Sequence, residues 1–145
     1  MKKLLALSAV GLLLAGCATQ PDTLSRVEKN QAYEAYVTEH NIASVKRVNN
    51  FRMNNWQSLT DSYFTVKGPF KKHYLIALKG RCSDLDYAQT LITHQTTSSQ
   101  LSKNFDAVSV PTYPHFKCYI KEIYPISKEQ HKEIAAIGKP PKNEE

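Results

Sequence analysis

Apolar and polar residues alternate through the middle of the chain in a pattern that predicts β-strands. Residues 73–78, His-Tyr-Leu-Ile-Ala-Leu, form the strongest of these segments. Both faces of the segment are apolar after His73, so we expect a central strand that is covered on both sides. Weaker patterns, bounded by Gly, Pro and Asn, predict further strands at residues 45–53, 59–66, 105–110 and 117–124.

The segments between these strands are expected to be turns and loops. Asn54-Asn55 and Gly68-Pro69 each predict a turn, because these residues favour turn conformations. Residues 96–102 are polar and predict a loop. Residues 83–92 fit a helical turn as well as a strand, so both interpretations stay open for them.

Two capping boxes predict helices at the two ends of the folded part. Ser25-x-x-Glu28 predicts a helix over residues 24–39, because the two side chains can bond free backbone N–H groups of the first turn. Ser127-x-x-Gln130 predicts a second helix, which Gly138 would end.

These elements together predict an α+β fold. Its strands are expected to be mainly antiparallel and to curl into a small sheet or barrel, with an N-terminal and a C-terminal helix. Residues 24–138 would form a single globular domain, and residues 139–145 a disordered tail.

The beginning of the chain has the pattern of an export signal. Lys2 and Lys3 precede an apolar run over residues 4–14, which is too short to cross a bilayer as a helix. The run ends in Leu14-Ala15-Gly16-Cys17, which resembles the lipobox of bacterial lipoproteins.

The lipobox resemblance implies how the chain is processed and where it goes. Residues 1–16 would be removed as a signal peptide, Cys17 would carry the lipid, and residues 17–23 would form a lipidated tether. Ala18 stands where an aspartate typically retains lipoproteins in the inner membrane. We therefore expect a protein that is anchored by lipid to the outer membrane and faces the periplasm.

Size and charge limit the classes of partner. Removing the first 16 of 145 residues leaves 129, enough for one compact domain, and takes two lysines with it, so the formal charge falls from +6 to +4. A mildly basic domain suits anionic surfaces but lacks the dense positive charge of a nucleic-acid-binding protein. We expect no nucleic-acid partner and no cofactor.

Two cysteines remain besides Cys17. Cys82 and Cys118 allow one intramolecular pairing, and the periplasm is oxidising. A metal or redox pair is the alternative, but the chain has no Cys-x-x-Cys, and no histidine lies at ligand spacing from either thiol. We therefore predict a structural disulfide.

An ordered set of short motifs runs through the folded part. They are Trp56-x-x-Leu59, Tyr74-Leu75-Ile76-x-Leu78, Cys82-x-x-Leu85-x-x-Ala88, Phe105-Asp106-x-Val108 and Cys118-x-Ile120-x-x-Ile123. The set resembles the small proteobacterial lipoproteins gathered as domain-of-unknown-function family 6491, and the resemblance covers residues 45–137. The resemblance implies an exported, often lipidated protein with paired cysteines and no established activity. It supplies no catalytic residues.

Basic residues surround the predicted central strand, with Phe70 and Tyr74 between them. They are Lys67, Lys71, Lys72, Lys79 and Arg81. One hypothesis is a patch that binds anionic lipid headgroups, lipopolysaccharide phosphates or cell-wall carboxylates. The alternative is a solvated hairpin tip whose lysines prevent pairing with other strands.

Candidate catalytic residues are scattered. Asp84 and Asp86 could be metal ligands or an acid/base pair, but capping of a short helical turn is the simpler interpretation. The histidines show no metal-ligand spacing; they are His40, His73, His94, His115 and His131.

Two function classes follow from these patterns. The first is a non-enzymatic interaction or structural domain on the outer membrane, with an envelope protein or an anionic envelope component as partner. The alternative is a small envelope-acting enzyme that draws on Asp61, Asp84, Asp86, Asp106 and the histidines. A deep pocket that holds two or more of these groups would favour the enzyme.

Overall fold

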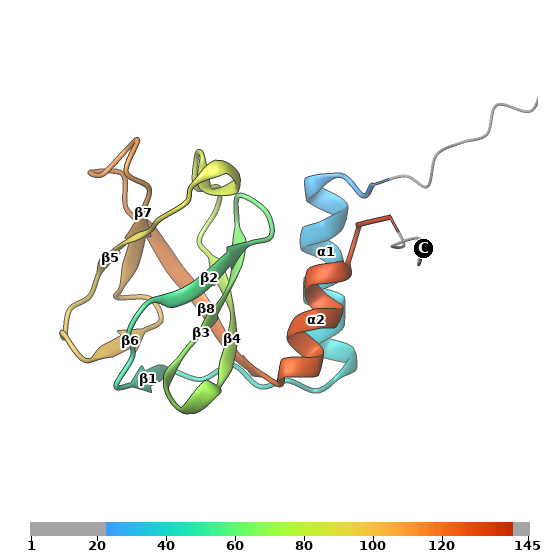
Figure 1. The fold of residues 1–145 in the computed structure, drawn as a ribbon, viewed down its shortest axis with the longest axis horizontal. Helices are drawn as coiled ribbons and strands as arrows, with labels where there is room; N and C mark the ends of the chain where they lie inside the picture. Colours follow the sequence, from blue (N-terminus) through green and yellow to red (C-terminus); the bar gives the residue numbers. More distant parts are fainter. Residues whose placement is uncertain (1–22, 141–145) are drawn as a thin grey trace, which may run out of the picture.

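The computed structural model describes residues 23–140 and has a strand-rich body with a helix at each end of the chain (Figure 1). The helices are α1 (Arg26–Glu39) and α2 (Lys128–Ala136). The strands are β1 (Arg47–Asn49), β2 (Asn54–Ser58), β3 (Tyr63–Lys67), β4 (His73–Leu78), β5 (Ile92–His94), β6 (Gln100–Ser102), β7 (Ala107–Ser109) and β8 (Cys118–Ile126). Short 3₁₀ turns are η1 (Pro69–Lys71) and η2 (Leu85–Tyr87). This arrangement confirms the predicted α+β class.

Part of the sequence prediction lies outside the described residues. This holds for the expected signal peptide over residues 1–16, for Cys17 and nearly all of its tether, and for residues 141–145 of the expected tail.

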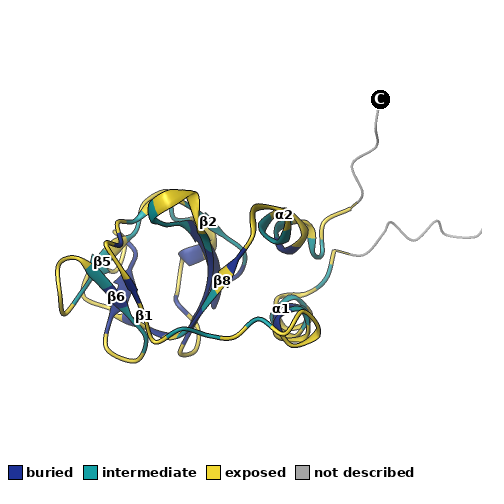
Figure 2. Cartoon of the chain, turned by 90° about the horizontal axis from the view of Figure 1, so that it is seen from below, coloured by how far each residue is buried: buried dark blue, intermediate teal, exposed yellow. Residues whose placement is uncertain are grey.

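The strands form one curled antiparallel sheet and one small pair. The sheet has six strands in the order β2-β3-β4-β8-β7-β5, and β1 pairs separately with β6. Figure 2 shows the sheet curling around a buried interior, with both helices on the outer side beyond β8. Strand β4 pairs with β3 and β8, which confirms that it is central.

Strand β4 contributes to a hydrophobic core on each of its faces. Tyr74, Ile76 and Leu78 belong to the core inside the curl, whereas Leu75 and Ala77 belong to the core under the helices. Full burial of each large apolar side chain stabilises the fold by about 1.5–3 kcal/mol. The helices therefore cover a sheet face that would otherwise be exposed and apolar.

Both capping boxes are present. The Ser25 hydroxyl accepts from the N–H of Glu28, whose carboxylate accepts from the N–H of Ser25, and Ser127 and Gln130 do the same in α2. Gly138 follows α2 with a φ of +72°, the left-handed conformation that glycine adopts without strain.

The prediction was wrong around Trp56. Residues 54–58 form strand β2 in place of the expected turn, and the predicted strand over residues 59–66 begins only at Tyr63. Asn55 has a φ of +44°, and the register shifts between Asn54 and Trp56. The two asparagines thus form a β-bulge in an edge strand, which has the same local composition as a turn.

The predicted polar loop over residues 96–102 also contains a strand, since β6 pairs with β1. Asp106 is fully buried beside it and accepts hydrogen bonds from the N–H groups of Thr96 and Ser102, at 2.8 and 2.6 Å. These bonds to a carboxylate fix the segment, which an isolated polar sequence does not indicate.

His131 connects α2 to the sheet. Its Nε2 lies 3.0 Å from Oγ1 of Thr65, and its ring stacks on His73 with 5.0 Å between ring centroids. Burial, followed by the nearby His73 and Lys139, lowers the pKa of His131. The folded state therefore favours the neutral imidazole.

We predict that acidification weakens the fold through His131. The unfolded chain takes up a proton near the ordinary pKa of 6.5, whereas the folded chain resists it, so stability is lost as the pH falls below 6.5. In urea denaturation at neutral and mildly acidic pH, His131→Gln should lose less unfolding free energy than the wild type. The matched control His115→Gln, on the surface, should behave like the wild type. Equal pH dependence of His131→Gln and wild type would contradict the assignment.

Candidate binding surface at the β3–β4 tip

The structure separates the predicted basic patch into two groups. Lys67, Lys71 and Lys72 lie at the connection between β3 and β4, whereas Lys79 and Arg81 follow the other end of β4. A six-residue strand such as β4 spans about 20 Å, so the five residues do not form one surface. We call residues 67–72 the basic tip.

Backbone hydrogen bonds close the basic tip. Gly68 N–H donates to the Lys72 carbonyl at 2.8 Å, and Lys72 N–H donates to the Pro69 carbonyl at 3.2 Å. A Cβ at Gly68 would lie 2.5 Å from Cε2 of Tyr74, so only glycine lets the backbone approach this ring. Tyr74 is buried, and its packing thereby fixes the base of the tip.

Phe70 at the end of the tip is both exposed and strained. Its side chain is 86% exposed, and its backbone is left-handed, with φ +55° and ψ +32°. A bulky residue with such a φ is uncommon, and the conformation costs about 1–2 kcal/mol. Its exposed ring cannot offset this cost by burial. Strained residues with exposed apolar side chains are concentrated at functional sites.

The three lysines of the tip are free of ion pairs within the described part of the chain. The salt bridges there join Asp61 to Arg26 and Arg81, and Glu122 to Lys103. Residues 67–72 also include no carboxylate. The tip therefore presents an aromatic ring among positive charges that an anionic ligand can neutralise.

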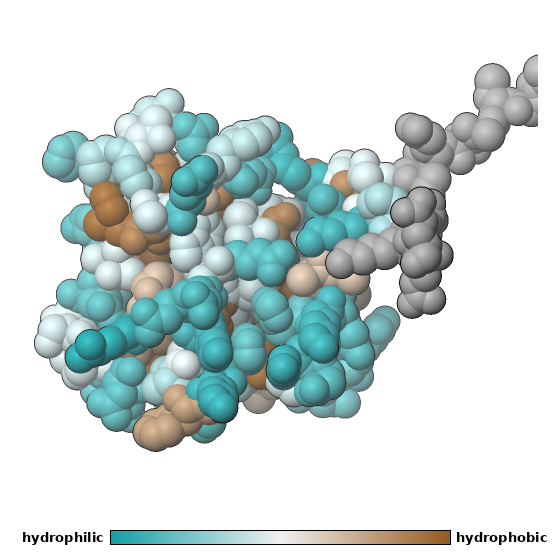
Figure 3. Space-filling view, in the orientation of Figure 1, coloured by the Kyte–Doolittle hydropathy of each residue, from teal (hydrophilic) through white to brown (hydrophobic). Residues whose placement is uncertain are grey.

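The face shown in Figure 3 is mainly hydrophilic, and its apolar residues occur in small separate groups. On this face the domain does not present a broad apolar interface of the kind that obligate partners bury. Small exposed sites such as the tip are the better candidates for recognition.

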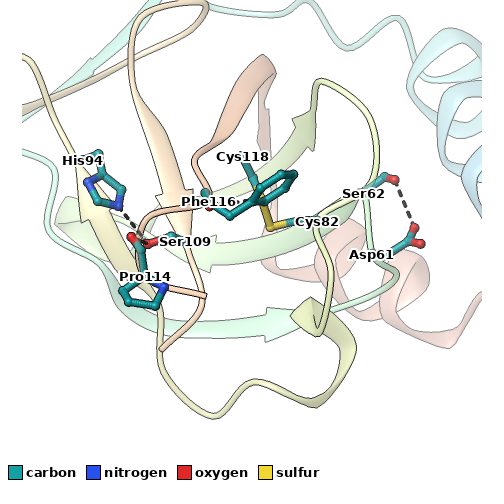
Figure 4. Close-up of a disulfide and its surroundings, with 8 residues drawn as sticks. All are labelled: Asp61, Ser62, Cys82, His94, Ser109, Pro114, Phe116 and Cys118. Atoms are coloured by element: carbon teal, nitrogen blue, oxygen red, sulfur yellow. Dashed lines mark hydrogen bonds between the residues drawn. A yellow bond between two sulfur atoms is a disulfide. The ribbon is translucent and has the colours of Figure 1, made fainter. Parts of the chain in front are cut away.

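At the other end of β4, Asp61 connects three segments. Its side chain, 8% exposed, accepts from Arg26 at 3.0 Å and from Arg81 at 2.6 Å. The Ser62 hydroxyl also donates to it at 3.0 Å, as Figure 4 shows. These contacts give Asp61 and Arg81 a structural role, so Arg81 belongs to a brace and not to the basic tip.

Cys82 and Cys118 form the predicted disulfide, with 5.7 Å between their Cα atoms. Both residues are buried, and Figure 4 shows them between the loop after β4 and the start of β8. In the chain-entropy model, closing a loop of this length stabilises the fold by about 4 kcal/mol.

His94 and Ser109 are close, but their geometry does not fit nucleophilic catalysis. His94 Nε2 lies 2.8 Å from Ser109 Oγ, and this hydroxyl donates to the Pro114 carbonyl at 3.0 Å (Figure 4). The hydroxyl proton is thereby directed away from the imidazole, which donates to Ser109, and Ser109 is fully buried. Burial, with a smaller effect of Lys117, lowers the pKa of His94.

The aspartates after Cys82 do not act as predicted. Asp84 precedes η2 with a φ of +62°, and its side chain caps no N–H group; Asp86 accepts from the Ser58 hydroxyl at 3.3 Å. The described residues contain no group of three His, Cys, Asp or Glu side chains that could bind a metal ion.

Two surface hollows of the described residues contain a predicted histidine, and neither brings it together with another candidate acid/base group. A groove of about 770 Å³ beside α2 includes His131, and a hollow of about 270 Å³ beside β5 includes His94. Neither is lined by a second member of the predicted set.

Comparisons with known proteins give one match. The model of a family of unknown function (DUF6491) matches residues 1–136. No curated protein and no solved structure matches the chain.

We predict that the strain at Phe70 can be measured. Phe70→Gly should be more stable than Phe70→Ala by about 1 kcal/mol in urea denaturation, because alanine keeps the Cβ that opposes a left-handed backbone. Phe105, also exposed but without a positive φ, provides the matched control. At Phe105 the alanine variant should be more stable than the glycine variant, because glycine increases the conformational entropy of the unfolded chain. If the alanine variant is also the more stable one at position 70, the backbone of Phe70 is unstrained.

Proposed function

The chain belongs to the family of unknown function (DUF6491), and from that premise we propose that it is a lipid-anchored protein of the outer membrane whose periplasmic domain binds an anionic component of the envelope. The domain is non-enzymatic. Its binding surface is the basic tip, and the ligand class we favour is the carboxylate-bearing polymer of the cell wall.

The observation that carries this proposal is Phe70. The ring is 86% exposed on a left-handed backbone, with Lys67, Lys71 and Lys72 around it. Near an anionic surface each lysine contributes about 1 kcal/mol to binding. A tip that only had to be soluble would not need an exposed aromatic residue in a strained conformation.

The position of the tip favours the cell wall over the anchoring membrane. The start of α1, which follows the first described residues, lies at the end of the molecule opposite to the β3–β4 connection (Figure 1). With a short tether attached at that end, the tip can extend away from the bilayer, where the carboxylates of the cell-wall polymer are within reach.

Sequence patterns support the localisation. Lys2, Lys3 and the apolar residues 4–14 precede Leu14-Ala15-Gly16-Cys17, and Ala18 follows. The Cys82–Cys118 disulfide is consistent with an oxidising compartment. Among residues 23–140, no helix is long and apolar enough to cross a membrane.

The contacts of the candidate acid/base groups support a non-enzymatic role. Asp61 is ion-paired, Asp106 accepts backbone N–H groups, and Ser109 is buried with its proton bonded to a carbonyl. Each of these three side chains thus has a structural partner.

Replacement of Cys17 by serine is expected to release the protein from the membrane. The sulfur of Cys17 is the lipobox atom to which the first acyl chains are attached. Without these chains the domain has no stable anchor. Fractionation of envelopes, with labelling by a radioactive fatty acid, tests this. Unchanged labelling and unchanged membrane association of Cys17→Ser would refute the localisation.

Removal of charge at the tip is expected to weaken binding to purified cell-wall sacculi. Lys71→Gln/Lys72→Gln should lower the affinity about thirtyfold, and Phe70→Ala should lower it as well. Lys79→Gln/Lys117→Gln, with the same loss of charge at the other end, is the matched control and should bind like the wild type. Cosedimentation at low and high salt gives the measurement, and wild-type binding should fall with salt.

Equal losses in the tip variant and its control would show unspecific attraction and refute the assignment of the tip. Binding to phosphatidylglycerol vesicles, with no binding to sacculi, would move the ligand from the cell wall to a lipid.

A further inference from the structure

The end of the domain opposite the basic tip carries three exposed aromatic side chains. Tyr87 is 86% exposed, Phe116 57% and Tyr113 50%. Tyr87 belongs to η2, and the other two belong to the loop between β7 and β8. Figure 1 shows both segments at the upper end of the molecule, together with the start of α1. We call these three residues the aromatic end.

The aromatic end is braced against the start of α1. Arg26 in the first turn of α1 and Arg81, a few residues before η2, both bind Asp61. The disulfide then joins Cys82 to Cys118, directly after the loop that holds Tyr113 and Phe116. These contacts connect the segments that carry the aromatic side chains to the start of α1.

The β7–β8 loop is itself ordered by tight turns. Tyr113 N–H donates to the Val110 carbonyl at 3.0 Å, and Phe116 N–H donates to the Tyr113 carbonyl at 3.1 Å. The rings are thus presented to solvent on a folded loop. Exposed aromatic residues in such a position mark an interaction surface.

The chain outside the structure indicates what covers this surface. Thr23 precedes α1 at the same end, and only five residues lie between it and Cys17. The six Cα–Cα steps from Cys17 to Thr23 span about 20 Å when fully extended. If Cys17 is lipidated, which rests on the proposed function, Thr23 lies within about this distance of the bilayer surface, and the aromatic end is at the same end of the molecule as the start of α1 (Figure 1).

We propose that the aromatic end docks on the headgroup layer of the bilayer that carries the lipid anchor. Tyrosine suits this layer because its ring is apolar and its hydroxyl is polar. Exposed Lys79 and Lys117 offset exposed Asp84 and Asp86 at this end, so the rings and not net charge provide the attraction. Tethering makes contact intramolecular, so that weak contacts suffice.

Tryptophan reporters at the two ends test the docking. The mature chain, with a hexahistidine tag in place of Cys17, is bound to vesicles of phosphatidylethanolamine, phosphatidylglycerol and a nickel-chelating lipid, some with brominated acyl chains. Trp56→Phe, which retains a ring beside Phe64, removes the natural tryptophan signal. Phe116→Trp then reports on the aromatic end, and Phe70→Trp on the basic tip.

Brominated lipid should quench the tryptophan fluorescence of Phe116→Trp at least twice as strongly as that of Phe70→Trp. High salt should leave this difference in quenching unchanged. Tyr113→Trp, a second reporter that does not depend on the folding of the first variant, should also be quenched. Equal or absent quenching at both ends of vesicle-bound protein would overturn the docking. Because the tag supplies the anchor, this outcome is independent of whether Cys17 is acylated in cells.

Discussion

Strand β4 has apolar side chains on both faces, and the domain must exclude water from both. On one face the curled sheet closes over Ile76, and on the other face α1 and α2 cover Leu75. A helix that buries Tyr33 or Ile134 against this face gains most of its stability from packing, since short helices are marginal alone. The helix–sheet arrangement thus depends on the pattern of one strand.

This constraint also separates the two ends of the molecule. Because both faces of β4 are covered, exposed segments next to it can only lie beyond its two termini. One terminus leads through Lys72 to the basic tip, and the other leads through Arg81 to the disulfide. The disulfide end is braced by covalent and ionic contacts, whereas Phe70 at the tip is strained and exposed. The strained tip therefore lowers the stability of the domain, and the brace and the hydrophobic core offset this loss.

Much of the fold could be predicted, since its signals are local. Both helices follow from capping boxes, β4 follows from six consecutive residues, and the disulfide follows from the number of cysteines and the expected compartment. Strand β2 could not be predicted in this way, because Asn54 and Asn55 serve equally well in a turn or a bulge. Only the pairing with β3 decides between them.

Prediction of the candidate site from local sequence signals is limited in the same way. Lys72 and Lys79 are close in sequence, but an extended strand places them at opposite ends of the domain. Asp106 gave no sign of burial, because its partners are backbone N–H groups of Thr96 and Ser102. The signal that was available at the tip is Gly68-Pro69 before Phe70, which indicates a turn around an aromatic residue but not its left-handed backbone.

The basic tip and the aromatic end lie at opposite ends of the domain and define an axis through it. If the chain is anchored at Cys17 as proposed, the end at which α1 starts stays near the anchor. The stiff sheet between Lys72 and Lys79 then holds the tip at a distance from this end. Flexible attachment alone would let the tip sample both the membrane and the space beyond it. Contacts of Tyr87 and Phe116 with the anchoring surface would remove this freedom, and the basic tip would then face a partner on the opposite side at a nearly constant distance. If the proposed lipid anchor at Cys17 is correct, the brace around Asp61 and the exposed Phe70 fit one arrangement, in which the domain bridges two layers of the envelope.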